Sequence, residues 1–224
     1  MNKLKTSLLA AAAGVLALAA TGAQAQVRIT EVAPWASGNA PYATDWFELT
    51  NFGSTAVSLS GWTMDDSSNG SAKVALAGIT SIAAGESVIF TETAAAASFL
   101  SAWFGANAPA SLKIGTYTGA GVGLSTSGDA VSIFNASGVL QANVSFGTAD
   151  ATSPYQTFDN AAGLNGVTIS QLSVVGVNGA FVAANDAAEI GSPGRISAVP
   201  EPESAALVLA ALAVVGLVAR KRQA

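Results

Sequence analysis

The chain has 224 residues, of which 50% are hydrophobic and only 10% charged, and it contains neither cysteine nor histidine. Disulfides, thiolate or imidazole metal ligands, and Ser-His-Asp or Cys-His catalysis are therefore excluded. Between residues 26 and 199, twelve acidic side chains outnumber four basic ones, and the resulting net charge of −8 repels phosphate backbones. We expect no nucleic-acid partner and no cofactor.

Residues 1–25 have the three parts of a secretory signal peptide: two lysines, an apolar run, and a site of small residues. The expected cleavage site is formed by Ala23, Ala25 and Gln26, with Gln26 as the mature N-terminus. The alternative is an uncleaved membrane anchor, which the short apolar run disfavours. The segment predicts export across the inner membrane and processing by a signal peptidase.

The stretch that follows the cleavage site alternates apolar and polar residues between turns, as short β-strands do. Its first segment, VRITEV, places Val27, Ile29 and Glu31 on one side of a strand. The segment DWFELTN alternates in the same way, with Phe47 and Leu49 on one face. Further apolar pairs separated by Gly, Ser and Asn turns indicate consecutive strands.

The middle of the chain predicts a central strand and one helix. Residues Ser87 to Glu92 have apolar side chains on both faces, which is typical of a strand covered on both sides. From Ala94 to Phe104, aromatic and leucine residues recur four apart, and Gly105 follows. We expect a short amphipathic helix that plugs the end of a sandwich.

The clearest hairpin joins Asp129 to Asn135 with Val139 to Phe146. Its expected core positions are Val131, Ile133, Leu140 and Val144. Another strand is expected from Val167 to Val175, and the last structured segment includes Phe181 and Val182. About seven to nine strands with one helix predict an all-β sandwich over residues 26–197.

Residues 198–224 have a different composition, in three parts. A Pro-Glu-Pro motif at Pro200, Glu201 and Pro202 keeps the backbone extended. Residues 204–219 are apolar or small and predict a helix of about 24 Å, a marginal transmembrane span for a hydrocarbon core of roughly 30 Å. The membrane stop is a basic cluster formed by Arg220, Lys221 and Arg222. The alternative is a permanent tail anchor.

Two parts of the chain resemble known families. The order ITEV, DWFELTN and VSLSGWTMDD, followed by AAGESVIFTE, GDAVSIFNASGVLQANVSFG and AEIGSPG, resembles the lamin tail domain. The tail resembles a PEP-CTERM sorting signal. The first resemblance implies an immunoglobulin-like β-sandwich that acts as a binding or tethering module. The second implies processing by an exosortase in a Gram-negative, exopolysaccharide-producing bacterium. The residues that carry the lamin tail resemblance are Glu31, Asp45, Trp46, Glu48, Leu49, Asn51, Leu59, Gly61, Trp62 and Asp65.

Three groups of residues are candidates for chemistry. Glu31 and Glu48 could meet across neighbouring strands as an acid/base pair. Alternatively, one of them accepts backbone hydrogen bonds or pairs with Arg28 or a nearby lysine, and we favour this structural interpretation. Oxygen ligands for a cation such as calcium could come from Asp65, Asp66 and Asn69. An exposed aromatic platform for sugar or peptide could include Trp35 and Tyr42, but core packing is the favoured interpretation of these aromatic side chains.

The sequence therefore predicts an exported, non-enzymatic surface or extracellular protein, transiently membrane-anchored and associated with an exopolysaccharide matrix or other matrix proteins. Two alternatives remain open. One is a carbohydrate- or calcium-binding sandwich module. The other is a carboxylate- or metal-dependent hydrolase.

Overall fold

The computed structural model describes residues 27–34, 42–67, 73–119, 122–149 and 153–196. Within these residues the chain forms fifteen short strands, the helix α2 (Ala96–Phe104) and the 3-10 turn η1 (Gly105–Asn107). No helix in these ranges is long and apolar enough to cross a membrane. The expected signal peptide, the helix at 204–219 and the boundaries of the processed protein fall outside the described ranges and remain predictions.

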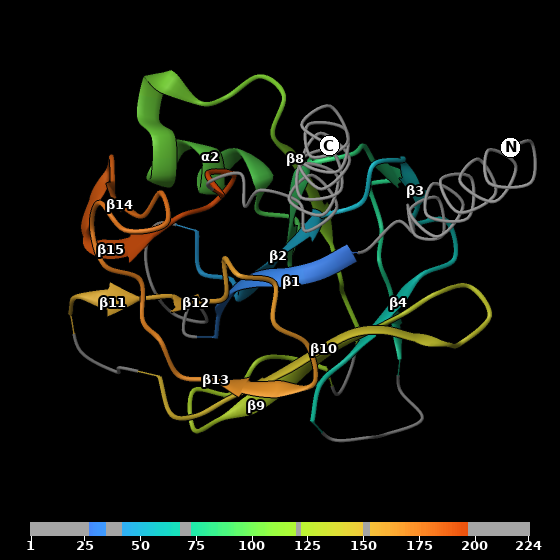
Figure 1. Cartoon of the computed structure of the whole chain (residues 1–224). Coiled ribbons are helices and arrows are strands. Elements are labelled where there is room, and N and C mark those ends of the chain that lie inside the picture. Colours follow the sequence, from blue (N-terminus) through green and yellow to red (C-terminus); the bar gives the residue numbers. More distant parts are fainter. Residues whose placement is uncertain (1–26, 35–41, 68–72, 120–121, 150–152, 197–224) are drawn as a thin grey trace, which may run out of the picture. The chain divides into compact units, whose positions relative to one another are not determined.

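Two five-stranded sheets form the sandwich, and Figure 1 shows β1 and β2 in one layer with β9, β10 and β13 in the other. In hydrogen-bonding order, the first sheet consists of β12 (Phe158–Asp159), β1 (Val27–Ala33), β2 (Trp46–Asn51), β7 (Ser87–Thr91) and β8 (Lys113–Thr116). The second consists of β13 (Val167–Ile169), β10 (Leu140–Phe146), β9 (Asp129–Phe134), β4 (Thr63–Asp65) and β5 (Val74–Ala75). The predicted all-β, immunoglobulin-like sandwich is confirmed.

Two smaller sheets complete the strand set. Their strands are β11 (Tyr155–Gln156), β15 (Asp186–Gly191) and β14 (Phe181–Ala183) in one, and β3 (Val57–Ser58) and β6 (Ser81–Ile82) in the other. The described strands outnumber the expected seven to nine because eight of the fifteen have only two or three residues. Such short segments carry too little alternation to be recognised individually.

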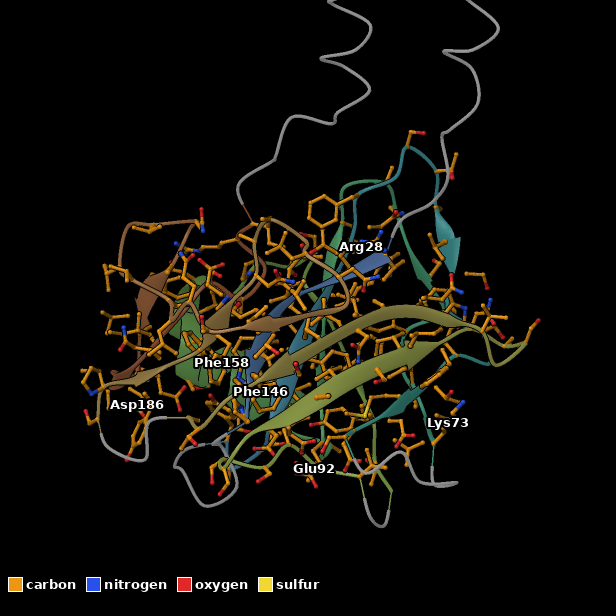
Figure 2. All side chains as sticks on the ribbon, turned by 60° about the horizontal axis from the view of Figure 1, so that its bottom comes forward. Arg28, Lys73, Glu92, Phe146, Phe158 and Asp186 are labelled. Carbon is orange, nitrogen blue, oxygen red and sulfur yellow. The ribbon has the colours of Figure 1, made fainter. Side chains whose placement is uncertain are left out.

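The main core lies between the two five-stranded sheets. Phe47 and Leu49 of β2 belong to the same buried cluster as Val131 and Val144 of the hairpin β9–β10. Figure 2 shows Phe146 and Phe158 beside each other in the interior, and their ring centroids are 5.2 Å apart. Burial of these apolar side chains is the principal driving force for the sandwich.

A β-bulge changes one predicted core position of the hairpin. The pairing of β10 with β9 shifts between Leu140 and Ala142, so Ala142 is buried while Leu140 is 51% exposed. The prediction that Leu140 is a core residue is therefore wrong, because one extra residue reverses the faces on either side of a bulge. Val131, Ile133 and Val144 are in the core as expected.

The helix α2 covers the outer face of the first sheet. Phe99 and Trp103 of α2 form a second buried cluster with Trp46 of β2 and Ile89 of β7. The helix connects β7 to β8, which pair in parallel, as a crossover connection requires. The predicted helix is confirmed, but it lies against a sheet face (Figure 1) rather than at the end of the sandwich, because Trp46 and Ile89 leave that face apolar.

Substitution Phe99→Ala should lower the free energy of unfolding by about 3–5 kcal/mol, because it leaves a cavity in a fully buried cluster. Ser101→Ala, on the exposed side of the same helix, is the matched control and should change stability by no more than about 0.5 kcal/mol. Urea denaturation followed by tryptophan fluorescence measures both. Equal stabilities of the two variants would show that the sandwich does not depend on the second cluster.

Candidate functional site: a buried carboxylate clasp

Glu31 and Glu48 are brought face to face by a second β-bulge. The pairing of β1 with β2 is Ile29 with Leu49 and then Glu31 with Glu48, so Thr30 is the extra residue. Simple alternation would have put Glu31 on the face of Val27 and Ile29. The bulge turns Glu31 instead to the outer face, where both carboxyl groups are 0% exposed.

The two carboxylates accept hydrogen bonds from the C-terminal end of the described chain. Glu31 accepts from the backbone N–H of Ser192 at 2.7 Å, from the Ser192 hydroxyl at 3.2 Å, and from Thr157. Glu48 accepts from the hydroxyl of Thr30 at 2.8 Å and from the backbone N–H of Gly194. We call Glu31, Glu48, Ser192 and Gly194 the carboxylate clasp.

The segment held by the clasp is a tight turn. Arg195 N–H donates to the carbonyl of Ser192 at 2.9 Å, with Pro193 and Gly194 at the two central positions. Gly194 has φ of +67°, so the arrangement is that of a type II turn, which favours Pro followed by Gly. Because Pro193 has no N–H, the donors on either side of it are the ones that the clasp binds.

Burial makes the clasp electrostatically unusual. Desolvation, together with the charge of Glu48, raises the pKa of Glu31 to about 8, against the lowering effect of its hydrogen bonds. Desolvation also raises the pKa of Glu48 to about 7. In the folded protein the pair therefore holds protons to a higher pH than free carboxyl groups do.

This geometry fits a structural role. Both carboxyl groups are inaccessible to solvent and accept hydrogen bonds from within the chain, so no substrate can reach them. Of the two predicted structural interpretations, acceptance of backbone hydrogen bonds is correct. The alternative partner Arg28 instead donates to the backbone carbonyl of Val27 at 3.1 Å.

Tyr42 is a core residue and not an exposed platform. It is 4% exposed, its hydroxyl donates to Glu189, and its ring packs against Phe99 with a centroid distance of 5.4 Å. Burial, mainly through desolvation, raises the pKa of Glu189 to about 7. Core packing of Tyr42, the favoured interpretation, is confirmed, and its candidate role as an exposed ligand-binding side chain is wrong, because α2 covers that side of the sheet. Its proposed companion, Trp35, lies outside the described residues.

Asp65 and Asp66, the cation candidates, organise loops. Asp65 accepts the N–H of Asp66 at 3.1 Å, and Asp66 accepts the N–H of Gly123 at 3.4 Å. The third candidate, Asn69, lies outside the described residues. Within those ranges, no group of three or more acidic side chains is placed to hold a metal ion.

The sequence pattern did not predict several hydrogen-bond partners of Glu31 and Glu48. Thr157 and Ser192 lie more than 120 residues from Glu31, so only the fold brings them together. The one available signal was the sequence Ser-Pro-Gly after a strand, which is typical of a type II turn. The cleavage, sorting-motif and membrane-stop residues lie outside the described part of the chain.

The two sheets and their shared core define the class of this protein as an all-β, immunoglobulin-like sandwich. The family model described as Lamin Tail Domain matches residues 20–148, more than half of the chain, and a PEP-CTERM protein-sorting motif matches residues 198–223. The chain therefore belongs to the lamin tail domain family. Its sorting motif implies processing by an exosortase, export and transient membrane anchoring. The search of curated proteins finds no match.

The stability of the protein should fall as pH rises from about 4.5 to about 8. The clasp glutamates and Glu189 have raised pKa values, so the folded state keeps protons that the unfolded state loses, at a cost on the order of 1 kcal/mol per pH unit for each group. Glu48→Gln should flatten this dependence, because it removes one titrating group and a charge beside Glu31. Urea unfolding of both proteins across this pH range measures how the free energy of unfolding changes with pH.

Glu92→Gln is the control, since this half-buried side chain lies outside the clasp. A Glu48→Gln profile as steep as that of the unsubstituted protein would contradict the assignment of the pH dependence to the clasp.

Gly191→Ala should destabilise the protein by about 1–3 kcal/mol, because there is no room for a methyl group next to the clasp. A Cβ at this position would lie 2.7 Å from Glu31 Oε1 and 2.8 Å from the Trp103 ring. Gly147→Ala is the matched control, since a Cβ there has no neighbour within 4 Å. Thermal unfolding compares the two, and equal melting temperatures would refute the close packing.

Proposed function

We propose that this protein is an exported, non-enzymatic surface protein whose lamin tail domain is a binding or structural module retained in an exopolysaccharide matrix. A signal peptidase would remove residues 1–25 and an exosortase would process the tail. The mature protein would then lie at the cell surface or outside the cell.

The observation that carries this proposal is the position of the clasp next to the sorting motif. The clasp binds Gly194, and the matched sorting motif begins at residue 198. In the sequence, three residues, 195–197, separate Gly194 from the matched sorting motif. Such an arrangement suits a folded domain that is delivered and displayed by its tail.

The distribution of charge supports contact with a neutral, hydrated polymer. Seven of the acidic side chains are buried, namely Glu31, Asp45, Glu48, Asp65, Asp129, Asp159 and Glu189. Figure 2 shows Lys73, Glu92 and Asp186 at the periphery and well separated. Because the net negative charge is largely internal, the described surface is dominated by uncharged polar and small residues.

The hydrolase alternative is disfavoured by the clasp. Glycoside hydrolysis by two carboxyl groups requires both to flank a bond of the substrate. Glu31 and Glu48 face each other, but they are fully buried and bonded to Ser192, Gly194 and Thr157. We therefore propose no enzymatic role for them.

Expression in an exosortase-containing host and in a matched strain without the exosortase tests the proposal. Intact mass of the fractions should show a species from Gln26 to near Pro200 outside the cell only when the exosortase is present. Replacing Pro200 and Pro202 by Ala should abolish this processing, whereas Pro109→Ala, in an exposed loop, should not. Retention of the basic tail in the membrane fraction of both strains would instead establish a permanently anchored envelope protein.

A further inference from the structure

A surface pocket of about 250 Å³ lies on the side of the sandwich formed by β12, β13 and their following loops. Its lining comes entirely from residues 159–178, beyond the stretch matched by the family model. Pockets that enclose drug-sized ligands have volumes of roughly 300–1,000 Å³, so this one suits a smaller group, such as one residue of a polymer.

The polar side of the pocket is organised by Asp159. This buried carboxylate accepts hydrogen bonds from Asn178 Nδ2 at 2.7 Å, from Gln171 Nε2 at 3.4 Å and from the backbone N–H of Ala161 at 2.8 Å. Because each amide group uses its nitrogen on Asp159, its oxygen remains an available acceptor. Among the described residues neither amide oxygen accepts a hydrogen bond, so both can receive hydroxyl groups of a ligand.

The chemistry of the lining disfavours charged ligands. None of the described residues that line the pocket is Lys or Arg, so this lining offers no counter-charge to a phosphate, sulfate or uronate. Asp159 is the only carboxylate among the described lining residues, and calcium takes six to eight oxygen ligands. The lining therefore fits a neutral ligand rich in hydroxyl groups better than a charged one.

Apolar side chains complete the pocket. Leu164, which is 54% exposed, and the buried Ile169 line it beside the amides. A sugar ring presents hydroxyl groups at its edge and C–H groups on its faces, which matches an amide edge next to an aliphatic surface.

We propose that this pocket binds a single residue of a neutral polysaccharide, with Gln171 and Asn178 accepting its hydroxyl groups and Leu164 covering a ring face. This inference rests on the proposed function, because residence in an exopolysaccharide matrix is what exposes the pocket to such a polymer.

Affinity electrophoresis of the full chain in gels containing dextran or the purified exopolysaccharide of the host tests the inference, with alginate as the charged probe. The unsubstituted protein should be retarded by a neutral polymer and not by alginate. Gln171→Ala and Leu164→Ala should each weaken the retardation at least tenfold. Both side chains are exposed, so these variants should keep the melting temperature of the unsubstituted protein.

Leu140→Ala is the matched control for Leu164→Ala, because Leu140 is 51% exposed and lies outside the pocket. Retention of full binding by both pocket variants would overturn the site, and absence of retardation by every neutral polymer would overturn the ligand class. Neither result affects export and sorting, which the fractionation experiment decides by itself. Conversely, absence of the protein from the cell exterior would refute the proposed function while leaving the electrophoretic result intact.

Discussion

The buried carboxyl groups of Glu31 and Glu48 accept hydrogen bonds from the backbone of the Ser-Pro-Gly turn, which pairs with no described strand. The burial of the polar part of the first sheet's outer face depends on this contact. Removing a carboxylate from water costs several kcal/mol, and so does burying an N–H without an acceptor. The two costs offset each other when Glu31 faces Ser192 and Glu48 faces Gly194. The carboxylates thus stand in for the carbonyl groups that an adjacent strand would supply.

The outer face needs such a cover because the first sheet is buried on both sides. Along β2, Trp46 and Glu48 point outward while Phe47 and Leu49 point into the main core. The helix α2 covers the apolar end around Trp46, and the Ser-Pro-Gly turn covers the polar end around Glu48. Residues beyond the family match at 148 are therefore integral to the fold, since β15 leads directly into that turn.

Sequence patterns predicted several elements that depend on local periodicity, although the strand expected from Val167 to Val175 ends at Ile169. The helix at Phe99 and Trp103, the two-sided strand β7 and the hairpin at Val131 and Val144 follow from spacing alone. The failures occur at Leu140 and Glu31, where one additional residue at a bulge reverses the alternation and leaves no mark in composition. The candidate exposure of Tyr42 was wrong for a different reason, because a helix more than fifty residues later in the chain buries this side chain.

The clasp also fixes the C-terminal turn of the described chain to the first sheet. In the first sheet β1 and β2 are flanked by β12 on one side and β7 on the other, so Glu31 and Glu48 project from interior strands. A chain end paired only to an edge strand can be peeled away one hydrogen bond at a time, as fraying termini are. The turn at Ser192 and Gly194 is instead bonded to interior strands through buried groups. Detaching the turn would break these bonds and expose both carboxyl groups at once.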